Sequence, residues 1–277
     1  MKKVVILFSA FLFLSIVPRN SSALSYYGFS EFGGKWVDAE KLPDNLEDDE
    51  MCWAAAASNI LNWTGWGDIF SDSEDAIFGY YQNHWTDLGG FMEYAWNWWF
   101  DGTNPSEGWA GYSQVDEPGG GFYTDLSFSD YYHGESYYGN TNGKNALNAI
   151  KNYLNSGYGV TLAIYGPGAH AITCWGYDYD EQDNVLGLWI TDSDDDKHLL
   201  SPPDQLAYYD VFQTDPQSKW FLADYAGSDG WYIDYVQALD RTPIPEPVSI
   251  LLFGSGCAVL GGMYRRKRGV LSVSQNT

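Results

Sequence analysis

A single cysteine at the start of an alanine-rich helix constrains this chain more than any other feature. In the run Asp48–Trp63 (DDEMCWAAAASNILNW), acidic residues able to cap a helix precede Cys52, and apolar residues follow at helical spacing. The pattern predicts a helix over 51–63 that ends near Gly65 or Gly67, with Cys52 in its first turn. Unpaired backbone N–H groups and the helix dipole favour an anion there, so a thiol beside a cation becomes a nucleophile. The other interpretation is a small buried cysteine on a core helix, which is the commoner place for this residue.

The N-terminus has the pattern of a secretory signal peptide. Two lysines precede an apolar run over 4–17 that ends at Pro18, and small residues at 21–23 suit a signal peptidase. We therefore expect a signal peptide over 1–23 and a mature chain that starts at Leu24. A retained N-terminal anchor is the alternative, but the run is short for a membrane span.

The C-terminus has a second apolar segment, over 248–264, and the basic cluster 265–268 follows it. The segment would be a helix of about 25 Å, just long enough for a bilayer core, with its basic end on the cytoplasmic side. A plain stop-transfer helix explains these two parts equally well. Pro245-Glu246-Pro247 directly before them favours a sorting signal over 244–268, and a short tail, 269–277, follows.

Together, these three C-terminal parts resemble the PEP-CTERM sorting signal of Gram-negative bacteria. The resemblance implies that an exosortase-type enzyme processes this end. It also implies a location in the cell envelope or on the extracellular surface of a Gram-negative bacterium, with a membrane anchor at least before processing. The tail is longer than is usual for such signals.

The charge balance excludes several classes of partner. Between the two ends, residues 24–247 carry seven basic and 37 acidic side chains, a net charge of −30. Such a surface argues against nucleic acid and against anionic membranes as partners. Disorder is excluded by 13 Trp, 22 Tyr and 14 Phe, which supply ample apolar area. We expect one globular domain over 24–243.

The cysteines and histidines give no disulfide framework and no metal signature. Cys257 falls in the C-terminal apolar segment, which leaves Cys52 and Cys174 in the domain. A bond between these two is conceivable, but an unpaired thiol in an oxidising compartment is more often kept for chemistry, and we assign Cys174 to the core. The four histidines are scattered, so we expect no metal and no cofactor.

Hydrophobic periodicity predicts helices in the first half of the domain and strands in the second. After 51–63, helices are expected over 73–83, 90–100 and 143–155, and strands over 160–165, 170–177, 185–191, 207–212, 220–222 and 231–239. Residues 25–46 are expected to be loop and short extended structure. Residues 102–142 are expected to be long loops with one or two short strands around 122–128. Helices followed by a meandering sheet indicate the α+β class.

The strand that begins at His170 supplies partners for the cysteine. The partner strand of its hairpin ends at Asp192, and in an antiparallel hairpin the end of the second strand lies beside the start of the first. Asp192 is therefore able to meet His170. A lone histidine at a strand end is usually structural, but this one has a carboxylate partner and a helical cysteine elsewhere in the chain. Cys52, His170 and Asp192 make a possible nucleophilic triad.

These residues carry a resemblance to the IdeS/Mac family of immunoglobulin-degrading cysteine peptidases. The matching segments are Asp48-Asp49-x-x-Cys52, His170–Asp180 and Ile190–Asp194, with a weaker match at 119–122. The resemblance implies a papain-like fold, with N-terminal helices packed on an antiparallel, barrel-like sheet, and cleavage of proteins without a cofactor.

The resemblance also implies a role for each site residue. Cys52 would be the nucleophile, His170 the general base, Asp192 the group that orients the imidazole, and Asp194 a supporting carboxylate. The family uses a lysine ahead of the cysteine in its oxyanion site. Trp36-x-Asp38-x-x-Lys41 resembles that segment if one residue is inserted before the cysteine, which makes Lys41 the candidate.

We therefore expect a surface-associated cysteine endopeptidase that acts on a protein or peptide. Two alternatives stay open. One is an acidic, aromatic-rich surface or matrix binding protein whose triad is vestigial. The other is a transglutaminase-like acyl transferase, because acyl transfer runs on the same cysteine, histidine and aspartate.

Overall fold

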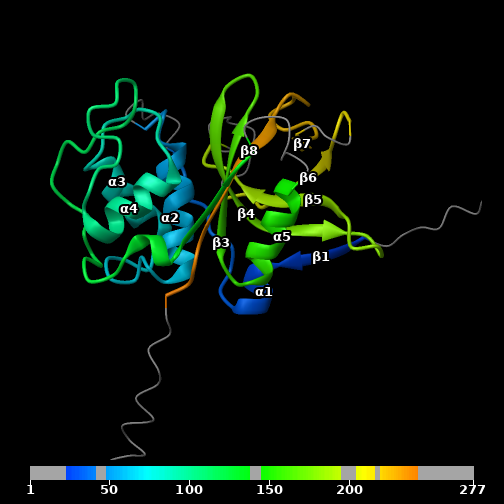
Figure 1. The fold of residues 1–277 in the computed structure, drawn as a ribbon, viewed down its shortest axis with the longest axis horizontal. Helices are drawn as coiled ribbons and strands as arrows, with labels where there is room; N and C mark the ends of the chain where they lie inside the picture. The colour runs from blue at the N-terminus through cyan, green and yellow to red at the C-terminus, as the bar shows by residue number, and fades with distance from the viewer. Residues whose placement is uncertain (1–22, 42–47, 138–144, 195–203, 216–218, 243–277) are drawn as a thin grey trace, which may run out of the picture.

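A group of helices and a closed antiparallel sheet lie side by side in the computed structural model (Figure 1). The structure describes residues 23–41, 48–137, 145–194, 204–215 and 219–242. Residues 1–22 of the predicted signal peptide, the predicted sorting segment 244–268 and the tail 269–277 lie outside these ranges. Within the described ranges, no helix is long and apolar enough to cross a membrane.

The helices and strands follow the predicted pattern closely. The helices are α1 (Gly28–Phe32), α2 (Cys52–Thr64), α3 (Glu74–Gln82), α4 (Met92–Asp101), the short 3-10 helix η1 (Phe128–Asp130) and α5 (Ala146–Asn155). The strands are β1 (Leu24–Tyr27), β2 (Tyr132–Ser136), β3 (Gly159–Tyr165), β4 (Ala169–Tyr179), β5 (Val185–Thr191), β6 (Ala207–Phe212), β7 (Phe221–Leu222) and β8 (Tyr232–Leu239). The predicted helices over 51–63, 73–83, 90–100 and 143–155 and the six predicted strands are confirmed. The helix α1 was not predicted.

The predicted strand around 122–128 is wrong. The backbone N–H groups of Gly121, Phe122 and Tyr123 donate to the carbonyls of Trp98, Trp99 and Phe100, the last turn of α4. The Trp98 carbonyl also accepts from the N–H of Gly102, the C-cap residue, at 2.9 Å. The segment thus adds partners for the carbonyls at the helix end instead of joining the sheet. The first regular strand after it is β2.

Six antiparallel strands form a closed ring in the order β4-β3-β8-β7-β6-β5, which the β4–β5 pairing completes. The predicted α+β class is confirmed, and the sheet is a barrel. Two more strands extend the ring: β1 pairs with residues 176–179 of β4, and β2 pairs with β8. The side chains of Ile172 and Cys174 on β4 belong to the barrel core, beside α5.

The helix α2 lies between α3 and α4 on one side and strands β3 and β4 on the other (Figure 1). Its alanines, Ala54–Ala57, are buried, and such small side chains let neighbouring elements approach closely on every side. The tryptophans of α4 are fully buried against it, so they are core residues. The helix ends at Gly65 in the left-handed conformation, as predicted.

The segment before α2 ties the helices to the sheet. The N–H of Ala39 donates to Asn59 Oδ1 on α2 at 2.7 Å, and the N–H of Lys41 donates to the Ser193 carbonyl just after β5 at 3.1 Å. The same Asn59 donates to Thr173 Oγ1 on β4 at 3.1 Å. These buried bonds bring Lys41, the start of α2 and the end of β5 to one place.

Candidate active site

Cys52 is the first residue of α2, so the predicted position in the first turn is confirmed. The predicted acidic side-chain cap is wrong, because Met51 is the N-cap residue and makes no side-chain cap. The acidic residues anchor the preceding loop instead. Asp48 Oδ2 accepts from Gln82 Nε2 on α3 at 2.9 Å, and the N–H of Glu50 donates to Asp87 Oδ1 at 2.8 Å.

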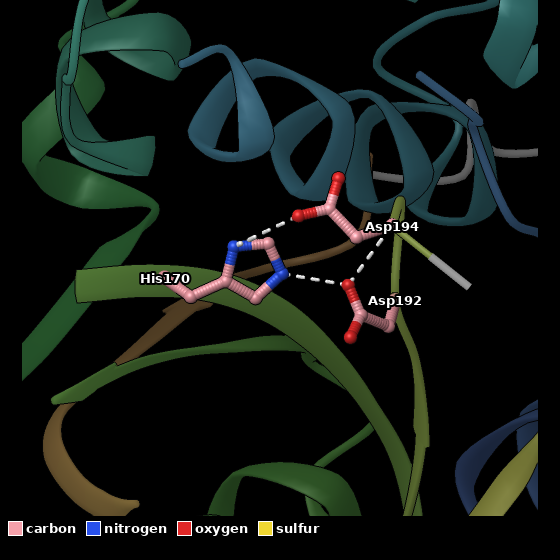
Figure 2. Close-up of side chains that lie close together, drawn as sticks. All are labelled: His170, Asp192 and Asp194. Carbon is pink, nitrogen blue, oxygen red and sulfur yellow. Dashed lines mark hydrogen bonds and ion pairs between the residues drawn. The ribbon is translucent and has the colours of Figure 1, made fainter. Parts of the chain in front are cut away.

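The imidazole of His170 contacts Asp192, as the hairpin predicts (Figure 2). The distance from His170 Nε2 to Asp192 Oδ1 is 2.6 Å. The geometry follows from the register, in which Thr173 of β4 pairs with Thr191, the last residue of β5. An ionised carboxylate only accepts hydrogen bonds, so Nε2 carries the hydrogen and Nδ1 is the nitrogen available to a thiol.

Lys41, which is buried, and Asp194, which is partly exposed, form an ion pair next to this contact. Lys41 Nζ lies 2.7 Å from Asp194 Oδ1 and also donates to the Asp49 carbonyl at 2.9 Å. Asp194 Oδ2 is 3.9 Å from His170 Nδ1. The structure thus brings both predicted residues to the site. The ammonium group of Lys41 is bound to Asp194 and to the loop that leads into α2.

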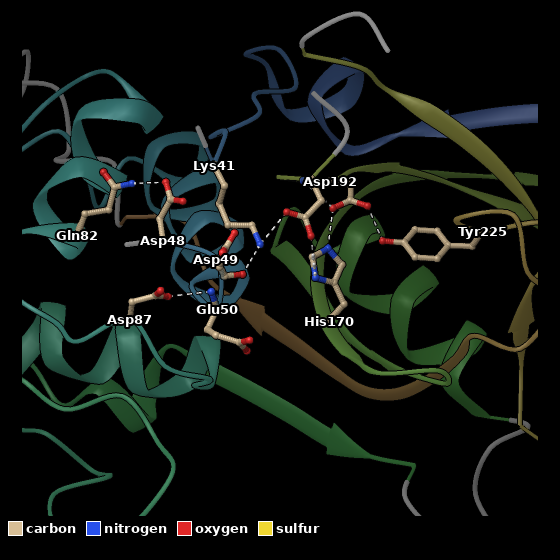
Figure 3. A network of polar contacts seen from close by, with 10 residues as sticks. Lys41, Asp48, Asp49, Glu50, Gln82, Asp87, His170, Asp192 and Tyr225 are labelled. Atoms are coloured by element: carbon tan, nitrogen blue, oxygen red, sulfur yellow. Dashed lines mark hydrogen bonds and ion pairs between the residues drawn. The ribbon is translucent and has the colours of Figure 1, made fainter. Parts of the chain in front are cut away.

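Tyr225 is a member of the site that the sequence did not indicate. Its hydroxyl donates to Asp192 Oδ2 at 2.5 Å, and its ring is 2% exposed (Figure 3). Burial and the nearby charge of Asp192 hold the pKa of the Tyr225 hydroxyl well above its ordinary value, so it stays protonated and able to donate. The residue lies between β7 and β8, and no spacing motif links it to the hairpin of β4 and β5.

The pKa shifts favour a thiolate and an imidazolium. Burial raises the pKa of Cys52, but the charge of His170, a hydrogen bond with it and the charge of Lys41 outweigh burial and lower the net value. Burial lowers the pKa of His170, but the charges of Asp192 and Cys52 raise the net value well above its ordinary range. For Asp192, burial raises the pKa, and the charge of His170 reverses the shift. Each group stabilises the charged form of its neighbour.

A cavity of about 100 Å³ opens at Cys52 and His170. Both parts of the fold line it: Glu50, Cys52 and Gly89–Met92 from the helical side, and Ala163, Tyr165 and Ala169–Ala171 from the barrel. The backbone N–H of Cys52 is in the first turn of α2 and has no acceptor inside the helix. A carbonyl group in the cavity would thus find a nucleophile and a hydrogen-bond donor on one residue.

Three of these side chains could also be considered as metal ligands. Donor atoms of His170, Asp192 and Asp194 lie within 4.8 Å of one another. However, the ammonium group of Lys41 already occupies Asp194, and the imidazole occupies Asp192. A further cation would have to displace these contacts, so the arrangement suits proton transfer better than metal binding.

Cys174 belongs to the core, as predicted. It is 1% exposed in the barrel, and burial raises its pKa to about 12. Cys52 and Cys174 are both free thiols, so the conceivable bond between them is not formed. Among the described cysteines, Cys52 is the one with access to the cavity.

The fold and site define an α+β protein with a Cys-His-Asp constellation at the junction of a helical region and a barrel. Residues 111–201 match the family model described as Mac 1, of the IdeS/Mac family. The match spans less than half of the chain. It includes His170, Asp192 and Asp194, whereas Cys52, Lys41 and Tyr225 lie outside it. No curated protein matches the chain. The family match is compatible with a cysteine-peptidase-like function.

Proposed function

We propose that this chain is an exported, surface-associated cysteine endopeptidase with a papain-like fold. It hydrolyses peptide bonds of a protein substrate through Cys52, His170 and Asp192, without a cofactor. The observation that carries the proposal is the 2.6 Å contact between His170 and Asp192, beside a cysteine whose pKa is lowered by that same imidazole. The Mac 1 match supports it from the sequence side.

In this mechanism the thiolate of Cys52 attacks the carbonyl carbon of the scissile bond and forms a tetrahedral oxyanion. The imidazolium of His170 then gives its proton to the leaving amine, and an acyl-enzyme thioester remains. His170 next takes a proton from water, which attacks the thioester; the carboxylic acid is released and the thiolate–imidazolium pair of Cys52 and His170 is restored. Asp192 keeps the imidazole oriented throughout, and Tyr225 keeps Asp192 oriented.

The oxyanion has two proposed donors, the backbone N–H of Cys52 and the side chain of Lys41. Each such donor contributes about 3–4 kcal/mol to stabilising the transition state in known enzymes. The ion pair of Lys41 with Asp194 fixes the position of the ammonium group. We propose Asp194 as the supporting carboxylate on these grounds.

Location and processing form part of the proposal. The signal peptide over 1–23 directs export, and the segment over 244–268 acts as a PEP-CTERM signal that an exosortase-type enzyme processes. The apolar residues 248–264 anchor the chain in the membrane before that step. The acidic composition of the domain supports a partner that is neither nucleic acid nor an anionic membrane surface.

The first test is the pH dependence of alkylation of Cys52 in the purified full chain, read by peptide mapping so that other thiols do not interfere. We expect an apparent pKa well below about 8.5, and we expect the His170→Ala variant to return it toward that value. An unreactive Cys52, or one with an ordinary pKa in both proteins, would contradict the activated pair.

The second test separates hydrolysis from its alternatives. The wild-type protein and the Cys52→Ala variant are incubated with denatured casein, with and without a fluorescent primary amine. Peptide products that depend on Cys52 support the peptidase. Incorporation of the amine without new termini would instead identify an acyl transferase, and a reactive Cys52 with neither product would favour a binding protein.

A further inference from the structure

Among the described side chains that line the cavity at Cys52, Glu50 supplies the one carboxylate. It lies two residues before the cysteine, on the loop that enters α2. Its neighbours around the cavity are mostly apolar: Phe91 and Met92 on the helical side, and Ala163 and Ala171 on the barrel side. The proposed chemistry uses Cys52 and His170 from this lining, and it does not use the charge of Glu50.

The position of Glu50 is fixed by its backbone. Its N–H donates to Asp87 Oδ1 at 2.8 Å, and the Asp49 carbonyl next to it accepts from Lys41 Nζ at 2.9 Å. The side chain itself is exposed. Figure 3 shows its carboxylate extending away from Lys41 and from Asp87. The charge is therefore held at the cavity by an anchored loop, while its oxygens remain open to a ligand.

The cations of the described chain do not neutralise this carboxylate. Lys41 pairs with Asp194, and Lys151 pairs with Asp183 at the turn between β4 and β5. The guanidinium of Arg241 lies 4.9 Å from the ring of Trp63. Within the described ranges, Glu50 forms no ion pair. A cationic group that enters the cavity could therefore pair with Glu50 without displacing a described cation from an ion pair.

We propose that Glu50 is a specificity-determining residue that selects peptide substrates with a lysine or arginine beside the scissile bond. The alkyl stem of such a side chain would lie on the apolar wall at Phe91 and Met92, and its charged end would reach Glu50. The acidic domain would favour approach of the same basic segments. This inference rests on the proposed function, because it concerns the substrate of the Cys52 site.

The test uses the full chain and a peptide library made by digesting a cell lysate with a protease that does not cleave at basic residues. The cleaved bonds are identified by mass spectrometry. We expect Lys and Arg to be enriched at one position within two residues of the cleaved bond. In Glu50→Gln that enrichment is lost. In Glu50→Lys it is replaced by enrichment of Asp and Glu.

The size of the effect is measured on a pair of synthetic peptides, taken from the best cleaved sequence, that differ only in Lys or Gln at the enriched position. We expect Glu50→Gln to lower the kcat/KM ratio of the Lys peptide to the Gln peptide by about fivefold, as for a partly solvated ion pair. Glu181→Gln, which removes a charge from the exposed turn after β4, is the matched control and keeps the ratio.

The outcomes separate this inference from the proposed function. Cleavage without enrichment of basic residues, or enrichment that survives in Glu50→Gln, would overturn the role of Glu50 and leave the peptidase intact. No cleavage of any peptide by a protein with reactive Cys52 would overturn both. Thermal melting of each variant shows whether the fold is kept, which an exposed side chain leads us to expect.

Discussion

Tyr225 and His170 bind opposite oxygens of the same carboxylate. His170 Nε2 contacts Asp192 Oδ1 at 2.6 Å, and the Tyr225 hydroxyl donates to Oδ2 at 2.5 Å. The N–H of Asp194 also donates to Oδ1, at 3.1 Å. With both oxygens held, the carboxylate is not free to turn about its terminal torsion. The orientation of the imidazole therefore depends on a tyrosine from the connection between β7 and β8.

Removing this hydroxyl tests that dependence. We expect Tyr225→Phe to lower kcat/KM by about tenfold, since a hydrogen bond to a charged group contributes about 1.5–3 kcal/mol. The bond also lowers the pKa of Asp192, so the acid limb of the pH–rate profile should move to higher pH. Tyr177→Phe, which loses a partly buried hydrogen bond to Asn155 at the end of α5, is the control and should leave that limb in place. An unchanged pH–rate profile in Tyr225→Phe would contradict the role of the Tyr225 hydroxyl in holding Asp192.

The pair of His170 and Asp192 should make stability depend on pH. The folded pKa of His170 is raised, so its contribution is complete below the unfolded value of about 6.5 and is lost as pH rises through the folded value. We expect the difference in unfolding free energy between Cys52→Ala and Cys52→Ala/His170→Ala to shrink from pH 6 to about pH 10. Urea unfolding at several pH values measures it. A difference that does not vary with pH would argue against a charged imidazole.

Lys41 should contribute to both reactivity and stability. In Lys41→Met we expect the apparent pKa of Cys52 to rise, but by less than in His170→Ala, because the charge of His170 acts more strongly on the thiol. Asp194 would lose its cation and is 38% exposed, so we expect destabilisation of about 2 kcal/mol rather than the 3–5 of a fully buried pair. Lys151→Met, at an exposed pair, is the control. A larger rise of the Cys52 pKa in Lys41→Met than in His170→Ala would contradict the conclusion that His170 acts more strongly on the thiol.

Substitution by alanine at two adjacent glycines of the cavity, Gly89 and Gly90, should affect stability differently. A Cβ at Gly90 would lie 2.6 Å from the indole of Trp53, whereas a Cβ at Gly89 would have no heavy atom within 4 Å. We expect Gly90→Ala to destabilise the fold by about 1–3 kcal/mol through overpacking. Gly89→Ala should leave the melting temperature nearly unchanged and raise KM, because its methyl group would occupy space in the cavity. Equal melting temperatures for the two variants would contradict this difference in packing.

Local patterns in the sequence predicted much of the site. The helix that begins at Cys52 and the hairpin that brings Asp192 to His170 are both short-range features, and their hydrophobic periodicity specifies them. The prediction of the antiparallel hairpin needs only the two strands and the turn between them. The same reasoning placed Cys174 in the core.

The contacts that escaped prediction depend on the tertiary fold. Tyr225 reaches Asp192 only because the ring of strands closes and carries the β7–β8 connection to the end of β5. Asp48 accepts a hydrogen bond from Gln82 on α3 rather than capping α2. Both the amide of Gln82 and the first N–H groups of α2 are suitable donors, and the local sequence does not decide between them. A short strand was predicted around 122–128, yet the N–H groups of Phe122 and Tyr123 donate to carbonyls at the end of α4.

The closed ring fixes the register of β4, so the position of His170 cannot change gradually. A strand at the edge of an open sheet is held by a neighbour on one side, but β4 pairs with β3 and β1 along one edge and with β5 along the other. A slip of one residue would have to break both edges together. It would also invert the alternation of β4, so that Ile172 and Cys174 would turn out of the barrel core and His170, on the same face, would turn away from Asp192. The imidazole is consequently either in place or lost with the fold, and gradual misalignment has no low-energy route.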